Sequence, residues 1–337
     1  MSAPQMPPDE RIANVQRLGY AQPEAEFLVL VALHGGYFVR RQFDSWIGVE
    51  RGKRSEDFLA DLLDRGHCRR HVFAHNRQVF RLRFKPLYRA VGDENSRNRR
   101  EHQPQAIKAR LMTLDFVLAH PEHLYFATAR EKIAYLCDER GIDHEALPAK
   151  VFRGQDGSAS TCRYFLDRFP LFTRPGVEEL AFCYIDSGFE TSGPFATHLR
   201  RYLPLFAELP SFELVYVAAG PTRLGQAQSV FERVLSRGRK WLTKVVDPDR
   251  FLAHFRDRRL FEKRETSGFD RLRLDALRDD MCCFSGRHFA QMFARWERFG
   301  DEAIRAEIAA EKMPNGRFSS CILPHEYDLL GRIEEAP

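Results

Sequence analysis

The sequence predicts an α+β chain of several domains, in which helical regions flank a small α/β sheet. Three observations lead to this fold class. The 337 residues are enough for two or three domains. Apolar residues follow helical spacing towards both ends of the chain, and short apolar runs alternate with helices between residues 145 and 238. Residues 1–22 are polar and rich in proline, so we expect them to form a flexible N-terminus.

Residues 23–92 have the order of three helices followed by a β-hairpin. The expected helices cover 23–39, 41–47 and 55–65, and the expected strands cover 71–73 and 78–84. Ser55 is the expected cap of the third helix, and His75-Asn76 forms the expected turn between the strands. This is the order of a winged helix, in which the third helix enters the major groove of DNA and the hairpin lies along its backbone.

Basic residues are concentrated in and directly after this segment. From Arg51 to Arg100 the chain has 14 Lys and Arg against 6 Asp and Glu, whereas the net charge of the whole chain is only +5. Such a cluster favours contact with the phosphates of double-stranded DNA. The residues expected to make these contacts are Arg51, Lys53, Arg54, Arg69, Arg70, Arg77, Arg81, Arg97, Arg99 and Arg100. The alternative is a winged helix that docks only onto protein.

Residues 93–144 are expected to be a linker followed by a helical connector. The polar stretch 93–105 predicts a domain boundary, and helices are expected over 105–118 and 128–139. Thr128 with Glu131 three residues later predicts a capping box at the start of the second helix. His120 and His123 flank Pro121 closely, and for this pair we favour a structural role over a metal site.

Residues 145–238 predict a small α/β domain with the order strand, strand, helix, strand, helix. The expected strands cover 163–172, 180–185 and 212–219, and the expected helices cover 195–206 and 226–235. The apolar run Leu180–Ile185 ends at Asp186 and is followed by a glycine-containing turn. Because ligands bind at the carboxyl ends of strands in such sheets, Asp186 and Glu190 are candidate site residues, together with Asp167 upstream. Residues 239–337 are strongly charged, and we expect a helical C-terminal region there.

The segment Leu180–Glu190 and the helix that follows it resemble the replication-relaxation proteins of plasmids and integrative elements. The resemblance is carried by Ile185-Asp186-Ser187-Gly188, Tyr202 and the strand Phe212–Ala219. Proteins of this family pair a winged helix with a nuclease-like α/β domain, and they look similar to the PD-(D/E)xK, or restriction-endonuclease-like, nucleases and to mobilisation relaxases. The resemblance implies DNA binding in the replication, maintenance or transfer of a mobile element, with other proteins of that element as further partners.

The resemblance also implies an alternative function, a Mg²⁺-dependent DNA-nicking nuclease. In that case Asp167, Asp186 and Glu190 would be catalytic carboxylates, with Asp186 binding the metal. The chain departs from the nuclease pattern twice, because Asp167 precedes rather than follows a proline and Gly188 stands where a lysine is usual. We therefore place DNA binding first, and for this function we expect no cofactor. Mg²⁺ is the expected cofactor only of the nuclease alternative. A non-catalytic winged-helix adaptor is the third alternative.

Other site classes are weakly represented in the sequence. No apolar run approaches the ~20 residues of a membrane helix, and the N-terminus lacks the features of a signal peptide, so we expect a cytoplasmic protein without a membrane partner. The seven cysteines have irregular spacing and no Cys-x-x-Cys pair, which argues against a disulfide framework or a zinc cluster. The sequence leaves the oligomeric state and the DNA sequence preference open.

Overall fold

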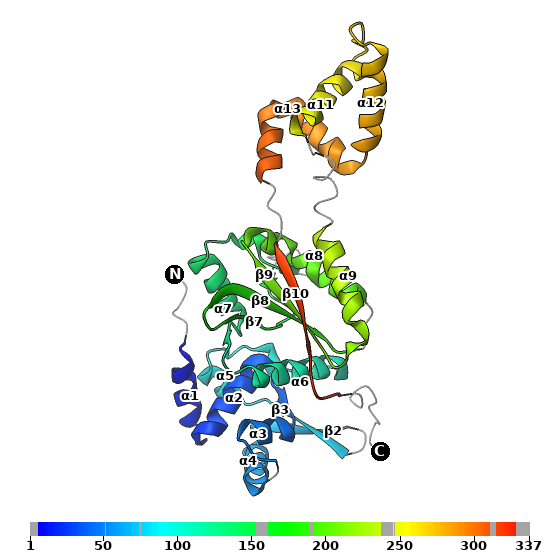
Figure 1. Cartoon of the computed structure of the whole chain (residues 1–337). Helices are drawn as coiled ribbons and strands as arrows, with labels where there is room; N and C mark the ends of the chain where they lie inside the picture. The colour runs from blue at the N-terminus through cyan, green and yellow to red at the C-terminus, as the bar shows by residue number, and fades with distance from the viewer. Residues whose placement is uncertain are drawn as a thin grey trace. The chain divides into compact units, whose positions relative to one another are not determined.

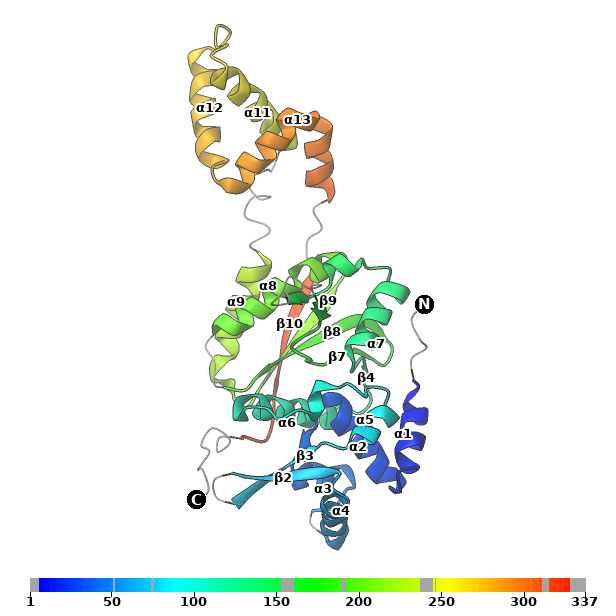
Figure 2. The same cartoon turned by 180° about the vertical axis from the view of Figure 1, so that it is seen from behind.

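Figures 1 and 2 show a computed structural model of the chain. It describes residues 6–50, 52–73, 76–152, 161–188, 192–236, 245, 247–310 and 315–327. The chain divides into two compact units, Met1–Phe231 with Asn315–Pro337, and Glu232–Pro314. Helices and sheets occur together, which confirms the mixed α/β class. No helix in the described ranges is long and apolar enough to span a membrane.

The N-terminal part of the first unit consists of helices around a small antiparallel sheet with the strand order β1-β3-β2. Its elements are α1 (Pro8–Gln16), α2 (Gln22–His34), β1 (Tyr37–Phe38), α3 (Arg40–Trp46), α4 (Lys53–Asp64), β2 (Cys68–Phe73), β3 (Arg77–Leu82) and α5 (Lys85–Ala90). Aromatic rings fill the core, with Phe27 in edge contact with Phe38 and Phe43. We expected Ser55 to cap α4, but the structure corrects this prediction. Ser55 lies inside the helix, and its hydroxyl donates a hydrogen bond to Asp44.

Helix α1 corrects the prediction of a flexible N-terminus for residues 8–16. Val15 is fully buried in the core that α2 forms with its neighbours, and the Arg11 guanidinium forms a buried ion pair with Glu131. The segment has few apolar residues, so periodicity alone did not identify it. Tertiary contacts rather than local hydrophobic patterning explain this helix.

The connector contains the turn η2 (Arg97–Arg99), α6 (Pro104–Ala119), β4 (Leu124–Tyr125), α7 (Ala129–Ile133) and its continuation η3 (Ala134–Glu139). The polar stretch 93–105 is packed into the structure, with Ser96 and Asn98 buried. The Asn98 amide donates to the carbonyls of Ala32 and Leu33 at the end of α2. The expected capping box of Thr128 and Glu131 is confirmed, with reciprocal bonds of 2.8 and 3.2 Å.

A five-stranded sheet of order β10-β9-β8-β7-β4 forms the rest of the first unit. Its further strands are β7 (Leu171–Arg174), β8 (Val177–Asp186), β9 (Phe212–Ala218) and β10 (Gly316–Ile322), and β5 (Ala149–Phe152) pairs separately with β6 (Thr161–Tyr164). Strands β8, β9 and β10 are parallel, and β7 is antiparallel to its neighbours. Helix α6 covers one face, and α8 (Ser192–Glu208) and α9 (Leu224–Leu235) cover the other (Figures 1 and 2).

Strand β10 corrects the prediction that residues 239–337 form a helical C-terminal region. The helical part of this range is the second unit, with α11 (Pro248–Glu262), α12 (Arg271–Cys283) and α13 (Arg287–Ala310) around a core that contains Phe251, Phe255 and Trp296. Along the chain, this unit lies between α9 and β10. It is therefore an insertion into the sheet domain rather than a C-terminal extension.

Candidate nucleic-acid surface and the carboxylates at the sheet end

Five of the basic residues expected to bind DNA lie exposed on the hairpin and at the start of α4. Arg69 and Arg70 belong to β2, Arg77 begins β3, and Lys53 and Arg54 form the first turn of α4. Within the described part of the chain, none of the five forms an ion pair. Their charges are therefore available to neutralise an external anion.

The strand register distributes the hairpin arginines over both of its faces. Arg70 lies opposite the core residue Phe80, whereas Arg69 and Arg77 lie opposite Arg81 and Phe73 on the other face. A groove of about 940 Å³ is lined by both Arg70 and Arg77, together with residues of α3, α4 and the segment after β10. Cationic side chains thus flank the hairpin from two directions.

The remaining predicted contacts occupy different environments. Arg81 is only 7% exposed and its Nη1 lies 3.2 Å from Glu101 Oε2, so the structure corrects the expectation that Arg81 faces a phosphate. Arg97 and Arg99 are half-buried in η2, and Arg100 beside them is exposed. Arg51 lies outside the described residues.

The exposed face of α4 is acidic from Glu56 to Asp64. Glu56, Asp57 and Asp64 are exposed and Asp61 is half-buried, while Phe58 and Leu62 face the core. These carboxylates would meet the negative potential of a DNA groove if the body of α4 entered it. The charge count over residues 51–100 did not show that the acidic residues lie mostly on α4. The basic residues of that range belong mostly to other elements.

Asp186 ends β8 with its carboxylate bound by protein donors. The Tyr216 hydroxyl donates to Oδ2 at 2.6 Å, the Gly188 amide donates to Oδ1 at 2.8 Å, and Arg223 Nη1 lies 3.6 Å from Oδ1. Gly188 has a φ of +82°, a left-handed conformation that favours glycine, and this turn brings its amide back to the carboxylate. Asp186 is therefore a satisfied strand-end carboxylate.

Asp167 lies in the loop between β6 and β7, where we expected a continuous strand. It accepts from His198 Nδ1 at 2.8 Å and from Arg201 Nη1 at 3.0 Å, both on α8. Burial alone would raise the pKa of Asp167, but these two partners outweigh it and hold the pKa below its usual value. Burial lowers the pKa of His198, so the neutral imidazole donates. The group lines a cavity of about 530 Å³.

The predicted cluster of Asp167, Asp186 and Glu190 remains a prediction, because Glu190 lies outside the described residues. In the described part of the chain, only His120, Glu122 and His123 bring three potential metal ligands within 4.8 Å of one another. Asp167 and Asp186 thus share no such group with a third described side chain.

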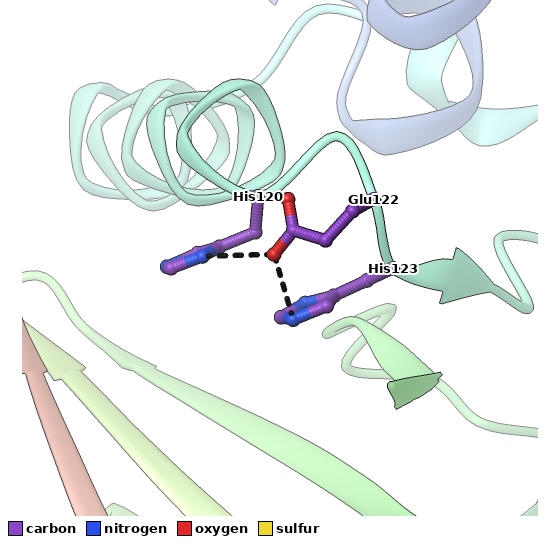
Figure 3. A group of neighbouring side chains, drawn as sticks. All are labelled: His120, Glu122 and His123. Atoms are coloured by element: carbon purple, nitrogen blue, oxygen red, sulfur yellow. Dashed lines mark ion pairs between the residues drawn. The ribbon is translucent and has the colours of Figure 1, made fainter. Parts of the chain in front are cut away.

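Figure 3 shows the group of His120, Glu122 and His123 in the turn between α6 and β4. Glu122 Oε1 lies 3.2 Å from His123 Nε2 and 3.7 Å from His120 Nδ1. The two imidazoles are stacked at 5.0 Å with an angle of 7°, and His123 stacks on Phe172 in the same way. An imidazole binds a metal ion in its own plane, so parallel rings do not converge on one ion. This geometry favours the structural role.

The partners of the two carboxylates could not be identified from the sequence. His198, Arg201 and Tyr216 lie 30 to 34 residues from the carboxylates that they bind. His198 is 4% exposed in the middle of an amphipathic helix, and that buried position was the one available signal.

Comparisons with models of protein families, with curated proteins and with solved structures find no match for this chain. Functional inference therefore depends on the residues and their arrangement. The resemblance to replication-relaxation proteins stays a proposal, with its basis in the segment around Asp186.

Proposed function

We propose that this chain binds double-stranded DNA through the hairpin β2–β3 and the first turn of α4, which together act as a winged helix. The observation that carries the proposal is a set of exposed arginines on both faces of one hairpin, Arg69, Arg70 and Arg77, which form no ion pair with a described residue. The order α2, α3, α4, hairpin supports it, as does the pairing of the hairpin with β1.

Recognition is proposed to depend on phosphate contacts rather than on base reading by α4. Glu56, Asp57 and Asp64 would face the DNA if the body of α4 entered a groove. Lys53 and Arg54 at the start of the helix and the hairpin arginines suit the backbone instead. Binding should therefore depend strongly on salt and weakly on sequence.

A role in a mobile element is part of the same proposal and has a separate basis. Its support is the order β8, Asp186, the Gly188 turn, α8 with Tyr202, and β9, which suits a nuclease-like α/β domain. The Mg²⁺-dependent nuclease ranks below DNA binding, because a metal ion on Asp186 would have to displace Tyr216 and Arg223. The acidic face of α4 is the feature that favours the adaptor alternative.

The proposal is tested by fluorescence anisotropy with a labelled duplex over a range of salt concentrations. The triple variant Arg69→Ala, Arg70→Ala, Arg77→Ala should bind about tenfold or more weakly, and the slope of log K against log salt should become shallower by about 2 to 3. The matched control is Arg200→Ala, Arg233→Ala, Arg271→Ala, which removes three exposed arginines from α8, α9 and α12. Equal affinity and slope in both triple variants would refute the role of the hairpin.

A further inference from the structure

A cavity of about 330 Å³ opens between the turn after α5, the start of α7 and the loop that joins β6 to β7. Cationic side chains dominate its wall. They are Arg97, Arg130, Lys132, Arg163 and Arg168, and the single carboxylate among the lining residues is Asp93.

Lys132 is 2% exposed. Its ammonium donates to the carbonyl oxygen of Phe169 at 2.6 Å and lies 5.5 Å from the centre of the Phe165 ring. Neither partner carries a negative charge, and Lys132 forms no ion pair with a described residue. Burial lowers its pKa to about 8, and the neighbouring Arg168 lowers it as well.

Arg168 is held in the wall by neutral groups. Its Nη1 donates to Ser96 Oγ at 3.1 Å and to Asn98 Oδ1 at 3.0 Å, and Arg110 donates to the same Asn98 oxygen at 3.4 Å. Two guanidinium groups thus share one amide oxygen, where a carboxylate would be the usual partner. Arg168 also has a φ of +55°, which is unusual for a residue with a side chain.

The positive charge of the cavity is not balanced by the described residues. Arg97, Arg130 and Arg163 form no ion pair in the described ranges, and neither does Asp93. Burial lowers the pKa of Arg168, and the charge of Asp93 opposes that shift. Lys132 is buried without a counterion among the described residues, whereas Arg97, Arg163 and Arg168 are half-buried and Arg130 is exposed. Burying a charge without a counterion is unfavourable, so the surroundings of Lys132 favour an anionic ligand.

We propose that this cavity binds a phosphomonoester dianion. Guanidinium groups suit phosphate oxygens by geometry, and the buried ammonium of Lys132 adds a point charge. The volume is at the lower end of ligand sites, which leaves room for a phosphate and a small part of the group that bears it. The phosphate is either that of a free nucleotide or the 5′-terminal phosphate of a DNA strand, and the two sources share this chemistry.

Isothermal titration calorimetry at pH 7.5 with AMP, adenosine and short single strands with a 5′-phosphate or a 5′-hydroxyl tests the proposal. AMP should bind and adenosine should not. If the phosphate belongs to a DNA end, the 5′-phosphate strand should bind at least about tenfold more tightly than the 5′-hydroxyl strand. If AMP binds but the two strands bind equally well, the ligand is a free nucleotide. Binding of adenosine as tightly as AMP would overturn the proposal.

The variant Arg130→Gln, Arg163→Gln should weaken AMP binding about tenfold or more, because it removes two charges from the wall. Arg200→Gln, Arg233→Gln removes two exposed charges elsewhere and should leave it unchanged. If both variants lose the same AMP affinity, the loss results from the lower net charge of the protein, and the proposed site is wrong. The hairpin variant Arg69→Ala, Arg70→Ala, Arg77→Ala should still bind AMP, so the failure of either proposal can be told from the failure of the other.

The pH dependence supplies a readout for Lys132. The groups that face it are Arg168, Asp167, Glu131, Cys183, His34 and His198. Burial lowers the pKa of both histidines and raises the pKa of Cys183 well above its usual value, so Lys132 is the group among them that loses its proton between pH 7.5 and 9.5. AMP affinity should fall over this range, and the fall should be absent in Lys132→Met. An identical fall in that variant would remove Lys132 from the site.

Discussion

Asp186 shows how one carboxylate at a strand end supports two different interpretations. By position, at the carboxyl end of a parallel strand and before a glycine turn, it is a candidate metal ligand. By its contacts, with Tyr216, the Gly188 amide and Arg223, it is a residue that fixes the turn after β8. Its contacts favour the structural interpretation, since each carboxylate oxygen already accepts a hydrogen bond.

The variant Asp186→Asn should therefore destabilise the protein and leave DNA binding intact. Loss of the charged hydrogen bonds should lower the free energy of unfolding by about 1–3 kcal/mol, measured by urea denaturation. Tyr216→Phe, which removes one of these donors, should cost about 1 kcal/mol. Mg²⁺-dependent nicking of supercoiled plasmid by the wild type, abolished in Asp186→Asn at unchanged stability, would instead establish the nuclease alternative.

At the scale of elements, the sequence was sufficient where apolar periodicity is strong. The hairpin, α4, β8, α8 and β9 were predicted close to their observed bounds, because each has an apolar face or run. The single strand expected over 163–172 is instead β6, a loop and β7. Phe165 and Arg168 in that loop have positive φ, and contacts of Arg168 with Ser96 and Asn98 hold it, which no local pattern signals.

Strand β10 was missed for a related reason. Its residues are half-buried or exposed without regular alternation, and it has few large apolar side chains, so it lacks the pattern of a strand. The strand forms because β9 offers a parallel partner along its whole length. Asp186 could be predicted from its place at a strand end, whereas Asp167 lies in a loop. The partners that neutralise both carboxylates could not be predicted, because they come from other elements.

Gly316 at the start of β10 provides a test of this packing. A Cβ at Gly316 would clash with the Phe212 ring, which is fully buried and stacks on Phe206 at 4.0 Å. Gly316→Ala should therefore destabilise the sheet by about 1–3 kcal/mol through overpacking. The control Gly225→Ala in α9 meets no atom within 4 Å and should be neutral or slightly stabilising in the same thermal unfolding assay. Equal stability of the two variants would show that β10 does not pack against Phe212.

At the scale of the whole molecule, Asp115 joins the N-terminal helices to the sheet. Its two oxygens accept from Arg41 at 3.1 Å each, from Gln42 at 2.8 Å and from the Tyr327 hydroxyl at 2.6 Å. These residues belong to α3, α6 and the segment after β10. The proposed DNA-binding elements and the sheet therefore form one compact unit, in agreement with the division of the chain.

The second unit interrupts a βαβ connection that would otherwise be complete. Strands β9 and β10 are parallel and adjacent, α9 lies between them in sequence, and such helix-to-strand connections usually need only about 2–6 residues. The inserted unit has its own aromatic core, with Phe251, Phe255 and Trp296. The first unit should therefore not need it for folding.

Replacing residues 237–313 with a linker of about six Gly and Ser residues should give a protein that unfolds cooperatively and binds duplex DNA with nearly unchanged affinity. The reason is that the hairpin β2–β3, α4 and all five strands of the larger sheet lie outside the deleted range. Circular dichroism and thermal unfolding would verify folding, and anisotropy would measure binding. Residues 232–314 contain 19 Lys and Arg against 15 Asp and Glu, so they have a modest positive charge of their own. A folded deletion variant that binds DNA much more weakly would show that the inserted helices supply phosphate contacts, and the hairpin alone would no longer explain the affinity.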